Sequence, residues 1–367
     1  AQSVGGHVDL MQRARPLPDW LADPATPAPL RERLALAQQL RRFAVTDLAL
    51  PDNASYTRYA DLGRNAAVWN VVAAPELSLS LKTWCYPVMG CVGYRGYFDR
   101  AAADAQSRML SESGLEALVY GVPAYSTLGW TNWIGGDPLL NTFVNGGEAA
   151  LARLVFHELA HQVLYVAGDT AFNESYATAV ERLGLVRWQA AAGRPAEDPA
   201  QAQRSADFRA ITQRARAALS SLYASDLPDA TKRERKAVLM AAMRSEHAAL
   251  KAGPWAGYTG YDAWFLRANN AALALQSAYD SLVPAFERLF QQRGGDFSRF
   301  HADWKDFFAW ADFKNTWTQI KFYLLLSEQR PEHRMLYGPL QSGAYLAVML
   351  MTFFIVLTGL IMMGAGY

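Results

Sequence analysis

The chain has 367 residues, of which 51% are hydrophobic and 12% aromatic, so it can bury one large core or two ordinary ones. Its formal net charge of +1 argues against a nucleic-acid partner, because proteins that bind nucleic acids usually present a strongly basic surface. Only two cysteines occur, Cys85 and Cys91. They argue against a zinc knuckle and leave two alternatives, a small disulfide loop or two buried free thiols.

Helix-like and strand-like patterns alternate ahead of residue 145. In chain order we predict a helix over about 30–45, strands over 67–73 and 77–84, a bent strand or hairpin over 90–98, a helix over about 100–112, and strands over 116–122 and 139–144. The last of these strands could lie along a cleft and pair with an extended peptide. These elements predict a small sheet in the N-terminal half.

A turn at 145–147 precedes a helix that we expect to begin near Glu148 and to end near Gly168. Its apolar residues lie on more than one side, which predicts a buried helix. The chain that follows, to about residue 300, is mostly helical in pattern. The predicted fold class is therefore α+β, with a small sheet beside this helix and a mostly helical C-terminal half.

This helix carries the sequence His157-Glu158-Leu159-Ala160-His161. Residues four apart share one face of a helix, so both imidazoles can bind the same metal ion. Glu158 lies beside that ion and can take a proton from a bound water. We therefore predict one Zn²⁺ bound by His157 and His161, with Glu158 as the general base.

A third protein ligand is needed. Leu164 and Ala167 stand where metzincins have glycine and histidine, so that class is excluded. We favour Glu174, at the start of a helix that follows a short turn. Asp169 and Glu181 are the rival ligands, although Asp169 could cap the turn and Glu181 could support a ligand histidine.

Two further roles are open at this point. For the residue that stabilises the oxyanion, the candidates are Tyr258, Tyr261 and His247, and we assign Tyr261. An aminopeptidase also needs an acidic group for the free amine of its substrate. The acidic candidates are Glu148, Asp137 and Glu181.

The tail has a different composition. No charged residue follows Arg334, and residues 343–367 are almost continuously apolar. About 20 such residues span the ~30 Å hydrocarbon layer. We therefore predict a transmembrane helix over 343–367, preceded by a connector with an amphipathic helix over 303–342; a buried helix of a soluble fold is the alternative. Lys321, Arg330 and Arg334 favour a cytoplasmic N-terminal side.

Over about residues 1–302 the chain resembles the predicted zinc-dependent aminopeptidases of Gram-negative bacteria, a gluzincin-like group. The resemblance is carried by residues 5–16, 69–76, 90–98, 122–130, 156–162 and 172–175. It implies a zinc peptidase domain over 1–302, located in the cell envelope on the periplasmic side. It also implies that His157, His161 and Glu174 bind the zinc and that Glu158 is the base.

Residues 303–367 resemble part of a cytochrome b subunit of the formate dehydrogenase or thiosulfate reductase type, through 317–326, 337–341 and 357–360. Haem needs axial ligands such as histidine, and the apolar run has none, so we expect no haem. The sequence as a whole predicts a membrane-associated zinc aminopeptidase that acts on peptide or protein substrates. The alternatives are an endopeptidase of the same mechanism and a membrane-tethered binding protein without catalysis.

Overall fold

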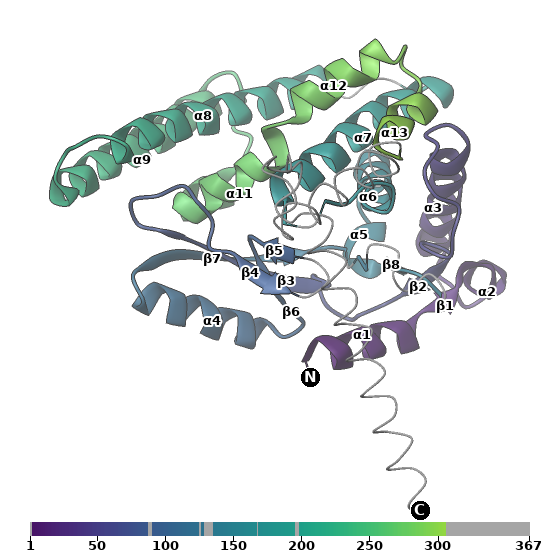
Figure 1. The fold of residues 1–367 in the computed structure, drawn as a ribbon. Coiled ribbons are helices and arrows are strands. Elements are labelled where there is room, and N and C mark those ends of the chain that lie inside the picture. Colours follow the sequence, from purple (N-terminus) through teal and green to yellow (C-terminus); the bar gives the residue numbers. More distant parts are fainter. Residues whose placement is uncertain are drawn as a thin grey trace, which may run out of the picture. The chain divides into compact units, whose positions relative to one another are not determined.

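The computed structural model of this chain describes residues 2–86, 90–124, 126–127, 135–166, 168–194 and 198–305. It divides into two compact units, 1–297 and 298–367. Within the second unit the description covers residues 298–305, which belong to the last helix. The first unit holds the other elements drawn in Figure 1, including the helix with the two histidines.

The elements have the following bounds. The helices are α1 (Gln2–Arg13), α2 (Leu17–Ala22), α3 (Ala28–Thr46), α4 (Arg100–Glu112), α5 (Asn141–Val144), α6 (Glu148–Ala160), α7 (Thr170–Ala191), α8 (Pro199–Tyr223), α9 (Asp229–Ala252), α10 (Asp262–Arg267), α11 (Asn270–Asp280), α12 (Val283–Gln292) and α13 (Phe297–Lys305). The strands are β1 (Arg15–Pro16), β2 (Arg58–Ala60), β3 (Val68–Pro75), β4 (Trp84–Tyr86), β5 (Gly90–Val92), β6 (Arg95–Tyr97), β7 (Leu115–Val122) and β8 (Leu139–Leu140).

The largest sheet has the order β6-β3-β7, with both neighbours antiparallel to β3. Successive side chains of a strand point to opposite faces. Val71 and Ala73 therefore pack with α4, while Val72 and Ala74 pack with α11 on the other face (Figure 1). Because both faces are covered, β3 is apolar at nearly every position, which is the pattern that predicted a strand over 67–73.

Two smaller sheets complete the β structure. In one, β2 pairs antiparallel with β1 and parallel with β8. In the other, β4 and β5 form a hairpin in which Cys85 faces Cys91. These two cysteines form a disulfide. Closing so short a loop stabilises a fold by about 2 kcal/mol through the entropy of the unfolded chain.

Helix α6 lies between α3 and α7 and is buried on more than one side, as its apolar pattern predicted. Phe156 of α6 contacts Phe43 of α3, with ring centroids 6.1 Å apart. On its other side, Phe156 faces Gly184 of α7, where an added Cβ would come within 3.0 Å of the Phe156 ring. A buried side chain of this size contributes about 1.5–3 kcal/mol, so this packing holds the motif helix rigidly.

Helices α8 and α9 pack side by side as a hairpin (Figure 1). With α10 they enclose a separate hydrophobic core, which we call the α8–α9–α10 cluster. Its buried members are Phe208, Ile211, Ala215, Leu219, Met240, Met243, Trp255, Phe265, Ala268 and Leu273. This cluster accounts for much of the predicted helical C-terminal half.

Three predicted element bounds differ from the structure. Residues 77–83 are not in a strand, and β4 begins only at Trp84. The predicted strand 139–144 is a strand over β8 alone, because its partner β2 pairs only as far as Ala60; residues 141–144 form α5. Helix α6 ends at Ala160 rather than near Gly168, and residues 161–163 form a turn.

The predicted fold class and location also need correction. The described residues form a mixed α/β fold with small sheets, and no helix among them is long and apolar enough to cross a membrane. The described fold therefore does not support the predicted transmembrane helix or the membrane-associated location. Residues 343–367, to which that helix was assigned, and residues 306–342 of the connector lie outside the described residues.

Candidate metal centre

The two histidines lie at the C-terminal end of α6. His157 is in its last turn, and His161 is the C-cap, with φ −59° and ψ −21°. These helical dihedral angles, and the hydrogen bond from the His161 N–H to the His157 carbonyl (3.3 Å), continue the helical path for one more residue. The two imidazoles therefore share one face even though the helix stops earlier than its sequence suggests.

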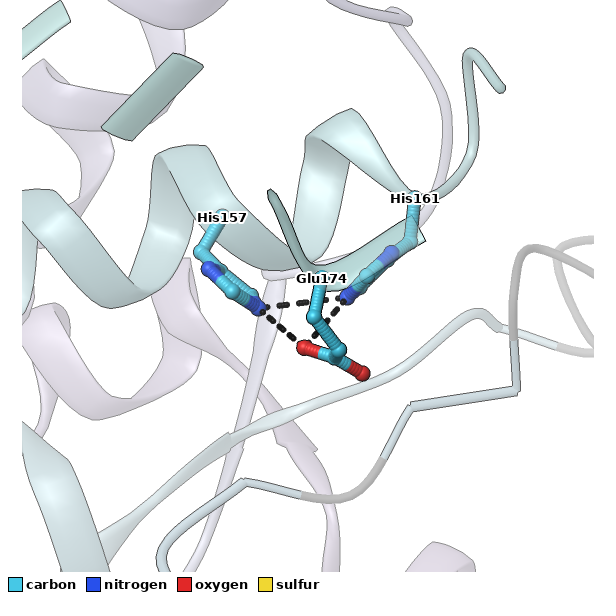
Figure 2. Close-up of side chains that lie close together, drawn as sticks. All are labelled: His157, His161 and Glu174. Carbon is cyan, nitrogen blue, oxygen red and sulfur yellow. Dashed lines mark hydrogen bonds and ion pairs between the residues drawn. The ribbon is translucent and has the colours of Figure 1, made fainter. Parts of the chain in front are cut away.

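The start of α7 brings the third group to this face. Asp169 is the N-cap, and its carboxylate accepts a hydrogen bond from the Phe172 N–H (2.9 Å). Of the two roles predicted for Asp169, rival ligand and cap, the structure shows the cap. The buried Asn173 side chain bonds both the N–H and the carbonyl of Val166, at 2.7 and 2.8 Å. The next residue, Glu174, thereby points back toward the histidines (Figure 2).

Three donor atoms converge on one point in Figure 2. The Nε2 atoms of His157 and His161 are 3.2 Å apart. The Glu174 Oε2 atom is 3.2 Å from His157 Nε2 and 3.7 Å from His161 Nε2. Tetrahedral zinc with bonds of about 2.0–2.1 Å holds its ligand atoms about 3.4 Å apart. The group His157, His161 and Glu174 could therefore bind a metal ion, and its spacing fits one.

The protonation of the site also favours a cation. Burial by itself lowers the pKa of His157. The hydrogen bonds to Glu174 and Glu181 and the charges of both carboxylates outweigh burial and raise this pKa well above its ordinary value. Burial raises the pKa of Glu174, yet the charges and hydrogen bonds of the two histidines bring it well below its ordinary value. The carboxylates thus stabilise positive charge on His157, and a bound metal ion would supply positive charge at the same place.

The two histidines are supported unequally. His157 Nδ1 lies 3.0 Å from Glu181 Oε2, and the other Glu181 oxygen lies 3.8 Å from Arg153. A carboxylate on Nδ1 fixes the tautomer that leaves Nε2 free to bind a metal. Glu181 is therefore placed to orient His157 and is not part of the converging group. His161 Nδ1 is buried and has no hydrogen-bond partner in the described part of the chain.

Glu158 follows His157 and is half-buried. Its negative charge raises the pKa of four other groups, and burial raises the pKa of each of them as well, so these groups lie near it. They are Tyr56, Tyr94, Asp137 and Tyr279. The general base that the motif predicted therefore lies near three phenols and one carboxyl group.

Two of these phenols also lie near Glu174, whose charge raises the pKa of Tyr94 and of Tyr279 beyond the effect of burial. The Tyr279 ring stacks on His157 at a centroid distance of 6.3 Å. Neither hydroxyl has a hydrogen-bond partner among the described residues. Both phenols stay protonated at neutral pH and can donate a hydrogen bond near Glu158 and Glu174.

Sequence reasoning missed both tyrosines. Tyr94 lies in the glycine- and aromatic-rich tract 90–98, which predicted a bend, and Tyr279 lies on α11. Neither carries a local pattern that distinguishes it from a core aromatic residue. Tyr94 packs with Val72, Ala74 and Ala271, and α11 packs against α7, so only tertiary packing brings the two tyrosines near Glu158.

The oxyanion donors predicted from sequence lie elsewhere. The Tyr261 ring stacks on Phe208 at 4.4 Å, and its hydroxyl is 3.3 Å from Ser205 Oγ. Tyr258 packs against the same α8–α9–α10 cluster, and His247 stacks on Phe265 at 4.1 Å. None of these contacts involves His157, His161 or Glu174, so the structure does not bring these three residues together with the ligand group.

The acidic candidates for binding a substrate amine are engaged within the protein. Glu148 accepts a hydrogen bond from the Trp188 indole (2.7 Å) and pairs with Arg194. Glu181 is bound to His157, as described above. The side chain of Asp137 is buried and accepts hydrogen bonds from the N–H and the hydroxyl of Thr127, at 3.0 and 2.8 Å. Burial has the largest effect on the pKa of this carboxyl group and raises it to about 6.

Comparisons with known proteins give one match. The model of the family Aminopep, described as "Putative aminopeptidase", matches residues 1–316 of the chain. The match covers the described fold and the metal-ligand group, and it extends past residue 302. No curated protein and no solved structure matches the chain.

Proposed function

The chain belongs to the Aminopep family, and from that premise we propose that it is a zinc-dependent peptidase that removes N-terminal residues from peptides. The observation that carries the proposal is the convergence of His157, His161 and Glu174, whose ligand atoms all lie within 4.8 Å of one another. Two imidazole nitrogens and one carboxylate oxygen are a ligand set that catalytic zinc uses, with a fourth position left for water or substrate. We assign this activity to a domain over residues 1–302.

When bound, zinc would lower the pKa of a coordinated water to about 7 and polarise the substrate carbonyl. Glu158 takes a proton from the attacking water as the new C–O bond forms. It then delivers that proton to the nitrogen as the C–N bond breaks, so the leaving amine departs neutral. Glu181 holds the Nδ1–H of His157 throughout and keeps the ring in its metal-binding tautomer.

Besides the metal, the oxyanion needs a hydrogen-bond donor. We assign this role to Tyr94 and Tyr279, because both phenols lie near Glu158 and Glu174. Replacing the principal donor by phenylalanine should lower kcat by about 10²–10³-fold with little change in KM, since the contact forms mainly in the transition state. Steady-state kinetics of Tyr94→Phe, Tyr279→Phe and Tyr261→Phe test this. A loss confined to Tyr261→Phe would contradict the assignment.

An endopeptidase of the same mechanism is the second candidate. It is favoured by one observation, the engagement of Glu148, Glu181 and Asp137 with protein groups, which leaves none of the three free for a substrate amine. The charge of Glu158 raises the pKa of Asp137 in addition to the effect of burial, so Asp137 lies near the proposed base.

A substrate panel tests the proposed function. We expect leucyl and alanyl 4-nitroanilides with free amines to be hydrolysed, and their N-acetylated counterparts to be inert, because an aminopeptidase binds the charged amine. An internally quenched peptide blocked at both ends is the third substrate. Cleavage of the blocked peptide alone would favour the endopeptidase, and no cleavage of any of them with zinc bound would contradict peptidase activity.

A further inference from the structure

Tyr56 is a buried residue that the proposed mechanism does not use. Its side chain is 0% exposed, and its backbone has φ +62°. A bulky residue in this left-handed region is strained and persists only where the surrounding structure holds it. The Tyr56 N–H donates to the Asp137 carbonyl at 2.6 Å, which ties the strained residue to the residue whose side chain lies near Glu158.

The segment around Tyr56 is bound to the end of the metal-binding helix. The Gln162 side chain, next to His161, donates to Ser55 Oγ (3.2 Å) and accepts from Asn53 Nδ2 (2.7 Å). Arg41 donates to the Ser55 carbonyl at 3.0 Å. These bonds leave Tyr56 little freedom relative to α6 and explain how its strained backbone is maintained.

The Tyr56 hydroxyl is buried and has no hydrogen-bond partner in the described structure. Burial raises the pKa of this phenol well above its ordinary value, and the charges of Glu158 and Asp137 raise it further. The hydroxyl is therefore a protonated donor without an acceptor among the described residues, and the bonds of Asn53 and Ser55 to Gln162 hold Tyr56 near the end of α6, the helix that carries the general base. An ordered water can satisfy a buried polar group left in this way when it has other polar partners.

The Glu158 carboxylate also lacks a hydrogen-bond partner in the described part of the chain. The residue is half-buried. A general base must be held within reach of the proton that it transfers, and an unrestrained glutamate samples several rotamers. A donor on the side away from the metal would restrict those rotamers.

We propose that Tyr56 is a positioning residue for Glu158, with its buried hydroxyl donating through one ordered water to the Glu158 carboxylate. This inference rests on the proposed function, because it concerns the base of that reaction. It also explains why a strained, buried tyrosine stands here: a phenylalanine would fill the same space but could not hold the water.

Tyr56→Phe tests this role. We expect kcat to fall by about tenfold, the size usual for residues that support a reacting group, with KM within about twofold and zinc content unchanged. Thermal stability should stay the same or rise, because the substitution removes a buried hydroxyl that has no protein partner. This combination separates positioning from a structural role, for which a loss of activity would come with a loss of stability.

Tyr59→Phe is the matched control, because Tyr59 is also buried, with 2% of its surface exposed. Burial and the charge of Asp61, which is not a residue of the site, raise the pKa of its phenol to about 12. It should leave kcat unchanged. An unchanged kcat in Tyr56→Phe, or a lower melting temperature, would overturn the proposal.

A crystal structure of the wild-type chain provides a readout that needs no substrate. It should show a water between Tyr56 Oη and the Glu158 carboxylate, and its absence would also overturn the proposal. Failure of the proposed function would instead appear in the wild-type chain, as no hydrolysis of the 4-nitroanilides or the quenched peptide, whatever residue 56 is.

Discussion

Glu158→Gln is expected to keep the metal and to lower kcat by about 10²–10⁴-fold, the usual contribution of a general base. Glutamine has nearly the same shape but cannot take a proton from water at neutral pH. Because Glu158 is not in the converging group of His157, His161 and Glu174, the substitution leaves all three ligand atoms in place. The measurements are steady-state kinetics on the hydrolysed 4-nitroanilide and the metal content of the purified variant.

The control for this substitution is Glu234→Gln, on an exposed position of α9. It makes the same chemical change away from the centre and should leave kcat unchanged. Retained activity in Glu158→Gln would rule out Glu158 as the base. Loss of the metal in Glu158→Gln would instead indicate that Glu158 has a part in binding it.

His157→Ala is expected to weaken zinc binding by more than about 10²-fold, because it removes one of three protein ligands. Removing the support of a ligand usually costs 10–100-fold, so Glu181→Gln should have a smaller effect in the same assay. The order His157→Ala, then Glu181→Gln, follows from the 3.0 Å contact between His157 Nδ1 and Glu181, which assigns Glu181 a supporting role. Competition with a chelator of known affinity measures both.

His247→Ala controls for the loss of a buried histidine, since His247 packs on Phe265 in the α8–α9–α10 cluster. The folded variant should bind zinc as the wild type does. Equal affinity in His157→Ala and the wild type would contradict the metal site. An effect of Glu181→Gln larger than that of His157→Ala would mean that Glu181 is itself a ligand.

The local features of the site could be predicted from the sequence. A spacing of four residues places His157 and His161 on one face of any helix, so their proximity needs no tertiary information. Asp169 is a favourable N-cap residue, and the short turn before it makes α6 and α7 neighbours, which brings Glu174 back toward the histidines. The end of α6 was predicted too late, because the apolar pattern continues through Val163 and Leu164 although the helix does not.

The strand errors have a different cause. An apolar run indicates that a segment can be a strand, but a strand also needs a partner along its whole length. Residues 77–83 lack such pairing, and β8 pairs with β2 only through Tyr59 and Ala60. Sequence periodicity contains no information about where a partner strand ends.

By itself the sequence determined which side chains converge, His157, His161 and Glu174, with Glu158 beside them as the proposed base, because all four lie in two consecutive helices and the turn between them, whose geometry follows from local periodicity and capping. Only the tertiary structure decided what surrounds them. Tyr56, Tyr94 and Tyr279 come from three segments far apart in the chain, and their approach to Glu158 depends on long-range packing. Such contacts leave no local pattern, which is why Tyr261 was chosen from the sequence and the tyrosines near the metal centre were not.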